Sequence, residues 1–96
     1  MITYFRDPGT EDIFNGISSK KALRFPREIW PVVQRKLDML NAAYELKDLM
    51  APPGNRLEKL KGELKEFYSI RANDQFRILF KWTGNNATDV ELTDYH

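Results

Sequence analysis

Residues 68–82 read Y-S-I-R-A-N-D-Q-F-R-I-L-F-K-W and carry the clearest structural pattern in the chain. Apolar residues recur at every second position on both sides of the polar sequence N-D-Q, at 68, 70 and 72 before it and at 76, 78, 80 and 82 after it. Alternation with period two is typical of β-strands that turn one face to a core. The stretch therefore predicts a β-hairpin.

The register of this hairpin follows from matching the faces of its two strands, because cross-strand partners share a face. A two-residue loop would set Ile70 opposite Arg77, apolar against charged. A three-residue connection over 73–75 instead matches apolar residues with one another, in the pairs Ala72–Phe76, Ile70–Ile78 and Tyr68–Phe80. We predict this second register. It gives an apolar inner face and a polar outer face that carries Ser69, Arg71, Arg77 and Lys81.

The same register sets Arg71 directly opposite Arg77 on the outer face. Like charges in that position repel each other unless an anion lies between them. The pair is therefore a first indication of a phosphate site. Two solvated arginines that splay apart explain the pair equally well.

Turn and strand signals continue on both sides of the hairpin. Downstream, the sequence G-N-N at 84–86 predicts a turn, and residues 88–95 alternate as a last strand. Upstream, leucines within 57–64 predict an early strand, in which Gly62 indicates a bulge or a close backbone approach. The sequence A-P-P-G-N at 51–55 predicts a rigid corner before this strand.

The beginning of the chain predicts one short strand and one short helix. Residues 2–5 form a β-like start. Thr10 is expected to cap a helix over 11–15, and Gly16 is placed to end it. Residues 16–24 are polar and basic, which indicates a loop or the frayed start of the next element.

A longer amphipathic helix follows. Apolar residues recur at steps of three and four from Ile29 to Tyr44, which predicts a helix that ends near Glu45. Pro26 or Pro31 must lie in its first turn, where a missing N–H does no harm. Residues 46–50 are expected to form a short turn.

Helices early and strands late indicate an α+β fold. Ninety-six residues suit one small domain, so 1–96 is predicted to be a single domain. We expect two N-terminal helices packed on one face of a twisted, mainly antiparallel sheet of about four or five strands. The opposite face and the sheet edges are expected to be available.

Composition excludes several kinds of site. The chain has no cysteine and one histidine, which excludes disulfides and zinc sites built from nitrogen and sulfur ligands. No window approaches a membrane span or a signal peptide, so we expect a protein of the cytoplasm without membrane contact. The net charge is +1, but residues 56–81 hold seven Lys or Arg against four acids. A basic patch in this region is one interpretation, and ordinary surface mixing is the other.

The residues of this chain fit best a reaction that needs few catalytic side chains. Phosphate-binding glycine motifs, metal-ligand spacing and a G-x-S-x-G nucleophile are absent. RNA cleavage uses the 2′-hydroxyl of the RNA as nucleophile, so a protein needs only cations for the phosphate and groups that move protons. Lys61, Arg77, Tyr95 and His96 lie in or beside the predicted sheet and could supply them. A frayed tail with Tyr95 half buried is the alternative for the last residues.

Several segments in order resemble the HigB, or plasmid-maintenance-killer, proteins of the RelE toxin superfamily. They are F-R-D-P-G-T-E-D-I-F-N-G at 5–16, R-K-L-D-M-L-N-A-A at 35–43, P-P-G-N-R-L-E-K-L-K-G at 52–62, the hairpin at 68–82 and V-E-L-T-D-Y-H at 90–96. The resemblance implies a small RelE-like fold. It also implies a bacterial toxin that enters the ribosomal A site, cuts messenger RNA without a metal or cofactor, and is neutralised by a helix-turn-helix antitoxin of the HigA kind. Operator DNA would be bound only through the antitoxin.

Carried over by position, the resemblance implies two sets of site residues. The catalytic set is Lys61, Arg77, Asp94, Tyr95 and His96. Arg77 and Lys61 would bind the scissile phosphate, Tyr95 and His96 would transfer protons or stack on a base, and Asp94 would orient His96. The RNA-binding set is Arg56, Lys65 and Arg71, each of which could equally be ordinary surface charge.

One position departs from the family pattern. Some relatives carry a histidine near the position of Glu58, and this chain has lost that imidazole. Either Glu58 acts as the base in its place or activity is weak. A non-catalytic protein that binds the ribosome or the antitoxin, and an unrelated small interaction domain, are the competing interpretations.

Overall fold

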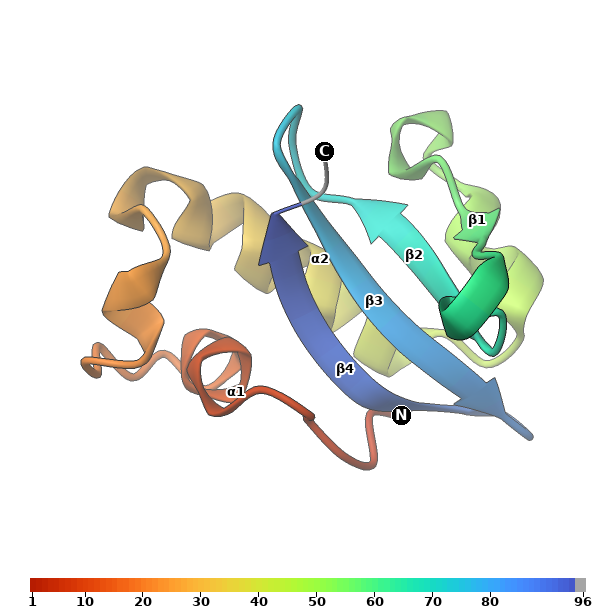
Figure 1. Ribbon diagram of the computed structural model, residues 1–96, viewed down its shortest axis with the longest axis horizontal. Coiled ribbons are helices and arrows are strands. Elements are labelled where there is room, and N and C mark those ends of the chain that lie inside the picture. The colour runs from red at the N-terminus through yellow and green to blue at the C-terminus, as the bar shows by residue number, and fades with distance from the viewer. Residues whose placement is uncertain (95–96) are drawn as a thin grey trace.

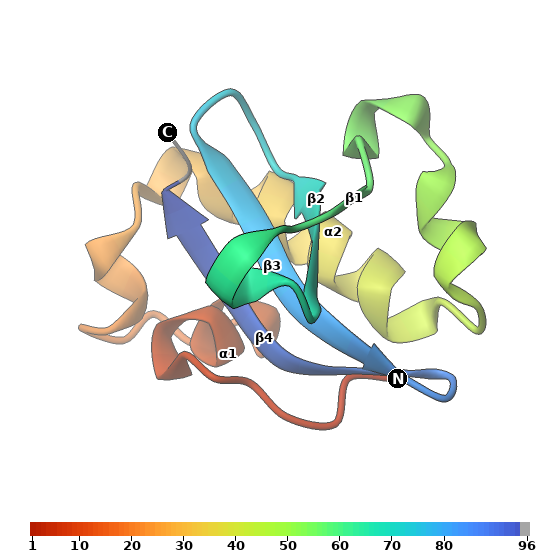
Figure 2. The same ribbon diagram turned by 45° about the vertical axis from the view of Figure 1, so that its right-hand side comes forward.

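A twisted antiparallel sheet of four strands forms the centre of the molecule, and two helices cover one of its faces (Figures 1 and 2). The structure is a computed structural model and describes residues 1–94. The strands follow one another in space as in sequence: β1 Glu58–Lys59, β2 Phe67–Arg71, β3 Phe76–Thr83 and β4 Asn86–Asp94. The helices are α1 Pro8–Phe14 and α2 Trp30–Ala42. The predicted α+β architecture is therefore confirmed.

The core lies between these helices and the inner face of the sheet. Val33, Leu37 and Leu40 of α2 are fully buried and pack with Ile78 and Phe80 of β3. The three residues of α2 are spaced at helical steps of three and four, and residues 78 and 80 are alternate positions of a strand. The helical and the strand periodicity therefore both place these side chains in the same core. No helix within residues 1–94 has the length and apolar content needed to cross a membrane.

The hairpin has the predicted register. Ile70 pairs with Ile78, Tyr68 with Phe80, and Arg71 with Arg77. The amide of Ala72 donates to the carbonyl of Phe76 at 2.9 Å, so three residues form the connection. The carboxamide oxygen of Asn73 accepts from the amides of Gln75 at 2.8 Å and Phe76 at 2.7 Å. This local side-chain bonding fixes the loop.

The last strand also follows the prediction, with an irregularity in its middle. Gly84, with φ of +61°, and Asn85 make the turn into β4. The pairing of β3 with β4 shifts between Leu79 and Lys81, where Asp89 adopts a φ of +52°. The predicted β-like start of the chain consists of two isolated parallel bridges to β4, Ile2 with Ala87 and Phe5 with Val90.

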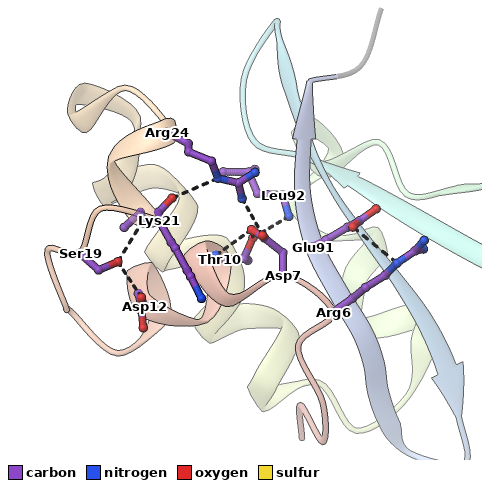
Figure 3. Close-up of polar contacts among 10 residues, drawn as sticks. Arg6, Asp7, Thr10, Asp12, Ser19, Lys21, Arg24, Glu91 and Leu92 are labelled. Atoms are coloured by element: carbon purple, nitrogen blue, oxygen red, sulfur yellow. Dashed lines mark hydrogen bonds and ion pairs between the residues drawn. The ribbon is translucent and has the colours of Figure 1, made fainter.

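The cap of α1 differs from the prediction (Figure 3). Asp7, not Thr10, caps the helix: its Oδ2 accepts from the amide of Thr10 at 2.9 Å and from the Thr10 hydroxyl at 2.7 Å. Pro8 then occupies the first helical turn, a position that favours proline. Thr10 is buried, and its hydroxyl oxygen accepts from the amide of Leu92 at 2.9 Å, which joins α1 to β4. Gly16, with φ of +74°, follows the helix end as predicted.

The region around α2 departs from the prediction at its end. Two 3₁₀ turns, Ala22–Arg24 and Arg27–Ile29, precede the helix, and of the two prolines predicted for its first turn it is Pro31 that lies there. The helix stops at Ala42 rather than near Glu45. The carboxylate of Asp48 accepts from the amides of Tyr44 at 3.1 Å and Glu45 at 2.9 Å. These bonds begin the next 3₁₀ turn, Leu46–Met50, and so compete with continuation of α2.

The predicted early strand is much shorter than expected. After the 3₁₀ turn Pro53–Asn55, only Glu58–Lys59 pairs with β2. Gly62 does not form a bulge: with φ of +69° it begins another 3₁₀ turn, Gly62–Leu64. This turn lies in front of the sheet in Figure 2.

Part of the outer face is covered, contrary to the expectation that it stays available. Leu60 packs there with Phe67 of β2 and Leu79 of β3 in a second, smaller apolar cluster. Each of these side chains is at most 7% exposed. Partly exposed side chains of the outer face remain on both sides of this cluster, Arg71 near the hairpin loop and Lys81 toward the other end.

Candidate functional site

The outer face carries a polar row at the hairpin end of the sheet. Strand pairing sets Arg71 of β2, Arg77 of β3 and Thr93 of β4 side by side. Asp94 follows Thr93 and pairs with Phe76. Phe76 belongs to the inner face, so Asp94 lies at the same end of the sheet as Arg77 but on the opposite face. On the outer face the structure brings together one predicted catalytic residue, Arg77, and one predicted RNA-binding residue, Arg71.

Arg77 is the most constrained residue of this row. It is only 8% exposed. Its Nε donates to the hydroxyl oxygen of Ser69 at 2.8 Å, and its Nη2 donates to the carbonyl of Arg56 at 2.6 Å. A buried guanidinium requires such partners, because a charge that is removed from water without hydrogen bonds is strongly destabilising. The plane of the Arg77 side chain is thus fixed by protein contacts.

Arg71 opposes Arg77 but has its own partner. Its Nη2 forms an ion pair with the carboxylate of Asp74 in the hairpin loop. Both arginines are therefore bonded to protein groups. The opposition of the two arginines does not in itself indicate a bound phosphate, and the picture of two solvated, splayed arginines is wrong for Arg77.

Asp94 stands at the rim of a pocket between the turn at 24–26 and the ends of β3 and β4. The pocket has a volume of about 460 Å³, and its lining includes Gln75, Phe76 and Thr93. The Nε2 of Gln75 donates to Oδ2 of Asp94 at 2.9 Å. The carboxylate of Asp94 is therefore oriented by the hairpin loop and open to solvent.

Lys61 lies in the segment between β1 and the 3₁₀ turn Gly62–Leu64, at some distance from Arg77. It is exposed, and it borders a pocket of about 310 Å³ together with Glu58, Lys59, Leu60 and Leu64. The amide of the preceding Leu60 bonds to Phe67, four positions along β2 from Arg71. At about 3.3 Å per residue, the backbone of Leu60 is about 13 Å along the strand from the row of Arg77, and Lys61 is the next residue.

The other predicted residues take different positions. Arg56 and Lys65 have exposed side chains, and Arg56 also contributes its carbonyl to Arg77. Glu58 is exposed and pairs with Ser69, whose hydroxyl holds Arg77. Tyr95 and His96 lie outside the described residues. Within 1–94 no three His, Cys, Asp or Glu side chains lie together as a metal site would require.

Ser69 and Asn55 are buried polar residues whose contacts the sequence did not reveal. Ser69 was predicted only as a polar residue of the outer face, yet it is completely buried and holds Arg77. Asn55 was predicted only as part of a proline-rich corner. It is also completely buried, and its Oδ1 accepts from Nζ of Lys36. Burial lowers the pKa of Lys36 below its usual 10.5, and nearby Arg35 and Arg71 lower it further.

Comparison with known proteins identifies the family. Residues 3–96 match the model of the HigB-like toxins, described as the RelE-like toxin of the type II toxin–antitoxin system HigB. Toxin HigB-1 of Vibrio cholerae serotype O1 is 38% identical over 92 residues, which cover 96% of this chain and 95% of that protein. An uncharacterised protein of Haemophilus influenzae is 38% identical over 69 residues, covering 72% of this chain and 68% of that protein.

Solved structures with the same fold include YoeB of Staphylococcus aureus. In the YoeB–YefM complex the likeness covers 100% of this chain and 98% of the other, with a TM-score of 0.61 and 16% identity. For the YoeB dimer the coverage is 100% and 97%, the TM-score 0.58 and the identity 19%. The RelE-like fold implied by the sequence resemblance is thereby confirmed. This chain belongs to the HigB-like family, the RelE-like toxins of type II toxin–antitoxin systems.

Proposed function

We propose that this toxin is a ribosome-dependent endoribonuclease that cuts messenger RNA and so inhibits translation. The observation that supports this most is the outer-face row of Arg71, Arg77 and Thr93 in a chain of this family. A fixed guanidinium is suited to a phosphate whose charge grows in the transition state, because donors that are already in place need no reorganisation during the reaction.

The proposed reaction is attack of the 2′-hydroxyl on the adjacent phosphorus, with departure of the 5′ oxygen. Arg77 and Lys61 bind the phosphate oxygens. His96 and Tyr95 take the 2′ proton and protonate the leaving oxygen, or stack on a base, and Asp94 orients His96. No metal or cofactor enters this scheme.

Contacts to the rest of the RNA come from the basic outer residues. Arg56 and Lys65 have exposed side chains that can reach phosphates, and Arg71 stands next to Arg77. Glu58 is an alternative base, since strand pairing places it beside Ser69, within the same face as Arg77.

Dependence on the ribosome enters this proposal from the family resemblance, and the small net charge fits it. At +1, the free protein can neutralise few phosphates and should bind RNA weakly. The ribosomal A site would instead hold the messenger RNA in the geometry for in-line attack, which can replace much of the binding energy.

The partner in this proposal is a helix-turn-helix antitoxin of the HigA kind, which neutralises the toxin and alone contacts operator DNA. The S. aureus neighbour YoeB was solved in complex with YefM, so a protein of this fold is known to bind a partner. The site of action is the cytoplasm, where translating ribosomes are found.

Mapping of messenger RNA 5′ ends after induction tests the proposal. New ends inside coding sequences, absent when translation is blocked beforehand, are expected. Stalled ribosomes without new ends would favour a non-catalytic protein that binds the ribosome. Association with neither ribosomes nor the product of an adjacent helix-turn-helix gene would favour an unrelated interaction domain.

A further inference from the structure

Asn55 is the one completely buried amide side chain among residues 1–94. Its Nδ2 donates to the carbonyl of Leu49 at 3.1 Å and to that of Ala51 at 3.3 Å. Its Oδ1 accepts from Nζ of Lys36 on α2. Asn55 therefore closes the corner at 49–55 and attaches it to the helix layer.

The next residue has a strained backbone. Arg56 has φ of 45° and ψ of 57°, the left-handed region, which residues with a side chain seldom adopt. The carbonyl of Arg56 accepts from Nη2 of Arg77 at 2.6 Å. The strained residue is thus held between a buried amide on one side and the guanidinium of the candidate site on the other.

We propose that Asn55 is a positioning residue for Arg77. By closing the corner, Asn55 sets the place of the Arg56 carbonyl, and this carbonyl and the Ser69 hydroxyl together fix the guanidinium plane. This rests on the proposed function, because the orientation of Arg77 affects cleavage only if Arg77 contacts the scissile phosphate. Asn55 itself touches no substrate.

Asn55→Asp is the first test variant, because it keeps the shape and the oxygen that Lys36 contacts but removes both N–H donors. Thr10→Val is the matched control. It removes the completely buried hydrogen bond from the amide of Leu92 and the bond to Asp7, neither of which involves Arg77 or its bonded partners Ser69 and Arg56. Both variants are compared with the parent at a temperature at which circular dichroism shows all three to be folded.

The first readout is the NMR signal of the Arg77 Nε–H, identified by its disappearance in Arg77→Lys. The parent and Thr10→Val are expected to show a signal that is protected from exchange with water, whereas Asn55→Asp loses that protection. An unchanged signal in folded Asn55→Asp overturns the proposal. If Asn55→Asp does not fold, Asn55→Ser, which keeps one donor, replaces it. The Arg77 Nε–H signal of this variant is then compared with that of the parent, with the same expected loss of protection.

The second readout is ribosome-dependent cleavage of messenger RNA. In Asn55→Asp, kcat is expected to fall on the order of 100-fold, the size of effect known for small misplacements of catalytic groups, with KM unchanged. Thr10→Val should cleave as the parent does. A normal kcat in Asn55→Asp, despite loss of the NMR protection, overturns the positioning role. If the parent itself cleaves nothing, the proposed function fails, and the NMR comparison still decides whether Asn55 orients Arg77.

Discussion

The Nε of Arg77 donates a 2.8 Å hydrogen bond to the hydroxyl of Ser69, on the neighbouring strand and completely buried. With the bond from Nη2 to the Arg56 carbonyl, this contact uses two nitrogens of one rigid plane. A lysine has a single ammonium on a flexible stem and cannot bond at both places with the same geometry.

Arg77→Lys should therefore impair both stability and cleavage. The Ser69 hydroxyl and the Arg56 carbonyl lose their donor, and unpaired buried groups of this kind cost about 1–3 kcal/mol each in the free energy of unfolding. Urea unfolding measures the loss of stability, and ribosome-dependent cleavage measures the loss of activity. Arg35→Lys, at an exposed arginine of α2, is the control and should leave both unchanged. Parent-like activity of Arg77→Lys would show that the fixed plane is unimportant.

The cap of α1 gives a second prediction, in which two variants separate the capping hydrogen bond of Asp7 from its ion pair. Asp7 accepts from the amide of Thr10 and forms an ion pair with Arg24 at 2.6 Å. Asp7→Asn keeps a capping oxygen and loses the ion pair, whereas Asp7→Ala loses both. Asp7→Ala should lower the free energy of unfolding by about 1 kcal/mol more than Asp7→Asn, the usual value of an N-cap. Equal urea midpoints for the two variants would contradict the assignment of the cap.

The bonds of Asp48 predict a pH dependence of stability. The amides of Glu45 and Tyr44 hold the pKa of the Asp48 carboxyl below its ordinary 3.8. A carboxyl whose pKa is depressed in the folded state adds stability above its unfolded pKa and loses this contribution as the pH falls through the folded pKa. Asp48→Ala should therefore be less stable than the parent at neutral pH and equally stable well below pH 3.8. Urea midpoints across this range measure the difference, and a gap that stays constant would contradict the assigned cause.

The inner face of the hairpin predicts a large core effect. Phe80 is the largest completely buried side chain within the described part of the chain. Phe80→Ala should lower the free energy of unfolding by about 3–5 kcal/mol through loss of buried surface and formation of a cavity. Tyr4→Ala, at a side chain that is 57% exposed, should change it by less than about 0.5 kcal/mol. Chemical denaturation of both variants makes the comparison.

Features governed by local pattern could be predicted from the sequence. Alternation on two short strands leaves only one register that matches apolar with apolar, so the pairs Ile70–Ile78 and Tyr68–Phe80 were predictable. The place of Pro31 in a first helical turn was predictable because proline lacks the N–H that an interior position needs. The cap of α1 could also have been found, because Pro8 at the first helical position favours Asp7 over Thr10.

Features that depend on distant partners could not be predicted in this way. Nothing in the alternation of 68–82 indicates that the corner before β1 returns to bond Arg77, 21 positions away from Arg56. For the same reason Arg77 and Ser69 looked like members of an open polar face, although both are buried. The early end of α2 depends on competition by Asp48, which the apolar periodicity does not register.

The candidate site was predictable in part. The sequence order of the strands is enough to bring Arg77 and Asp94 to the same end of the sheet, and the structure agrees, but strand alternation sets the two side chains on opposite faces. The position of Lys61 along the sheet depends on the two-residue strand β1 and on the 3₁₀ turn that follows it. Sequence patterns do not predict the lengths of such short elements.

Cleavage of one defined messenger RNA, labelled at its 5′ end, by purified protein with and without translating ribosomes tests the proposed function most directly. Discrete shorter labelled fragments should form only when ribosomes are present, and they should be absent with Arg77→Ala or with a chain that lacks His96. Arrest of protein synthesis while the messenger RNA stays intact, or unchanged cleavage by both variants, would contradict it.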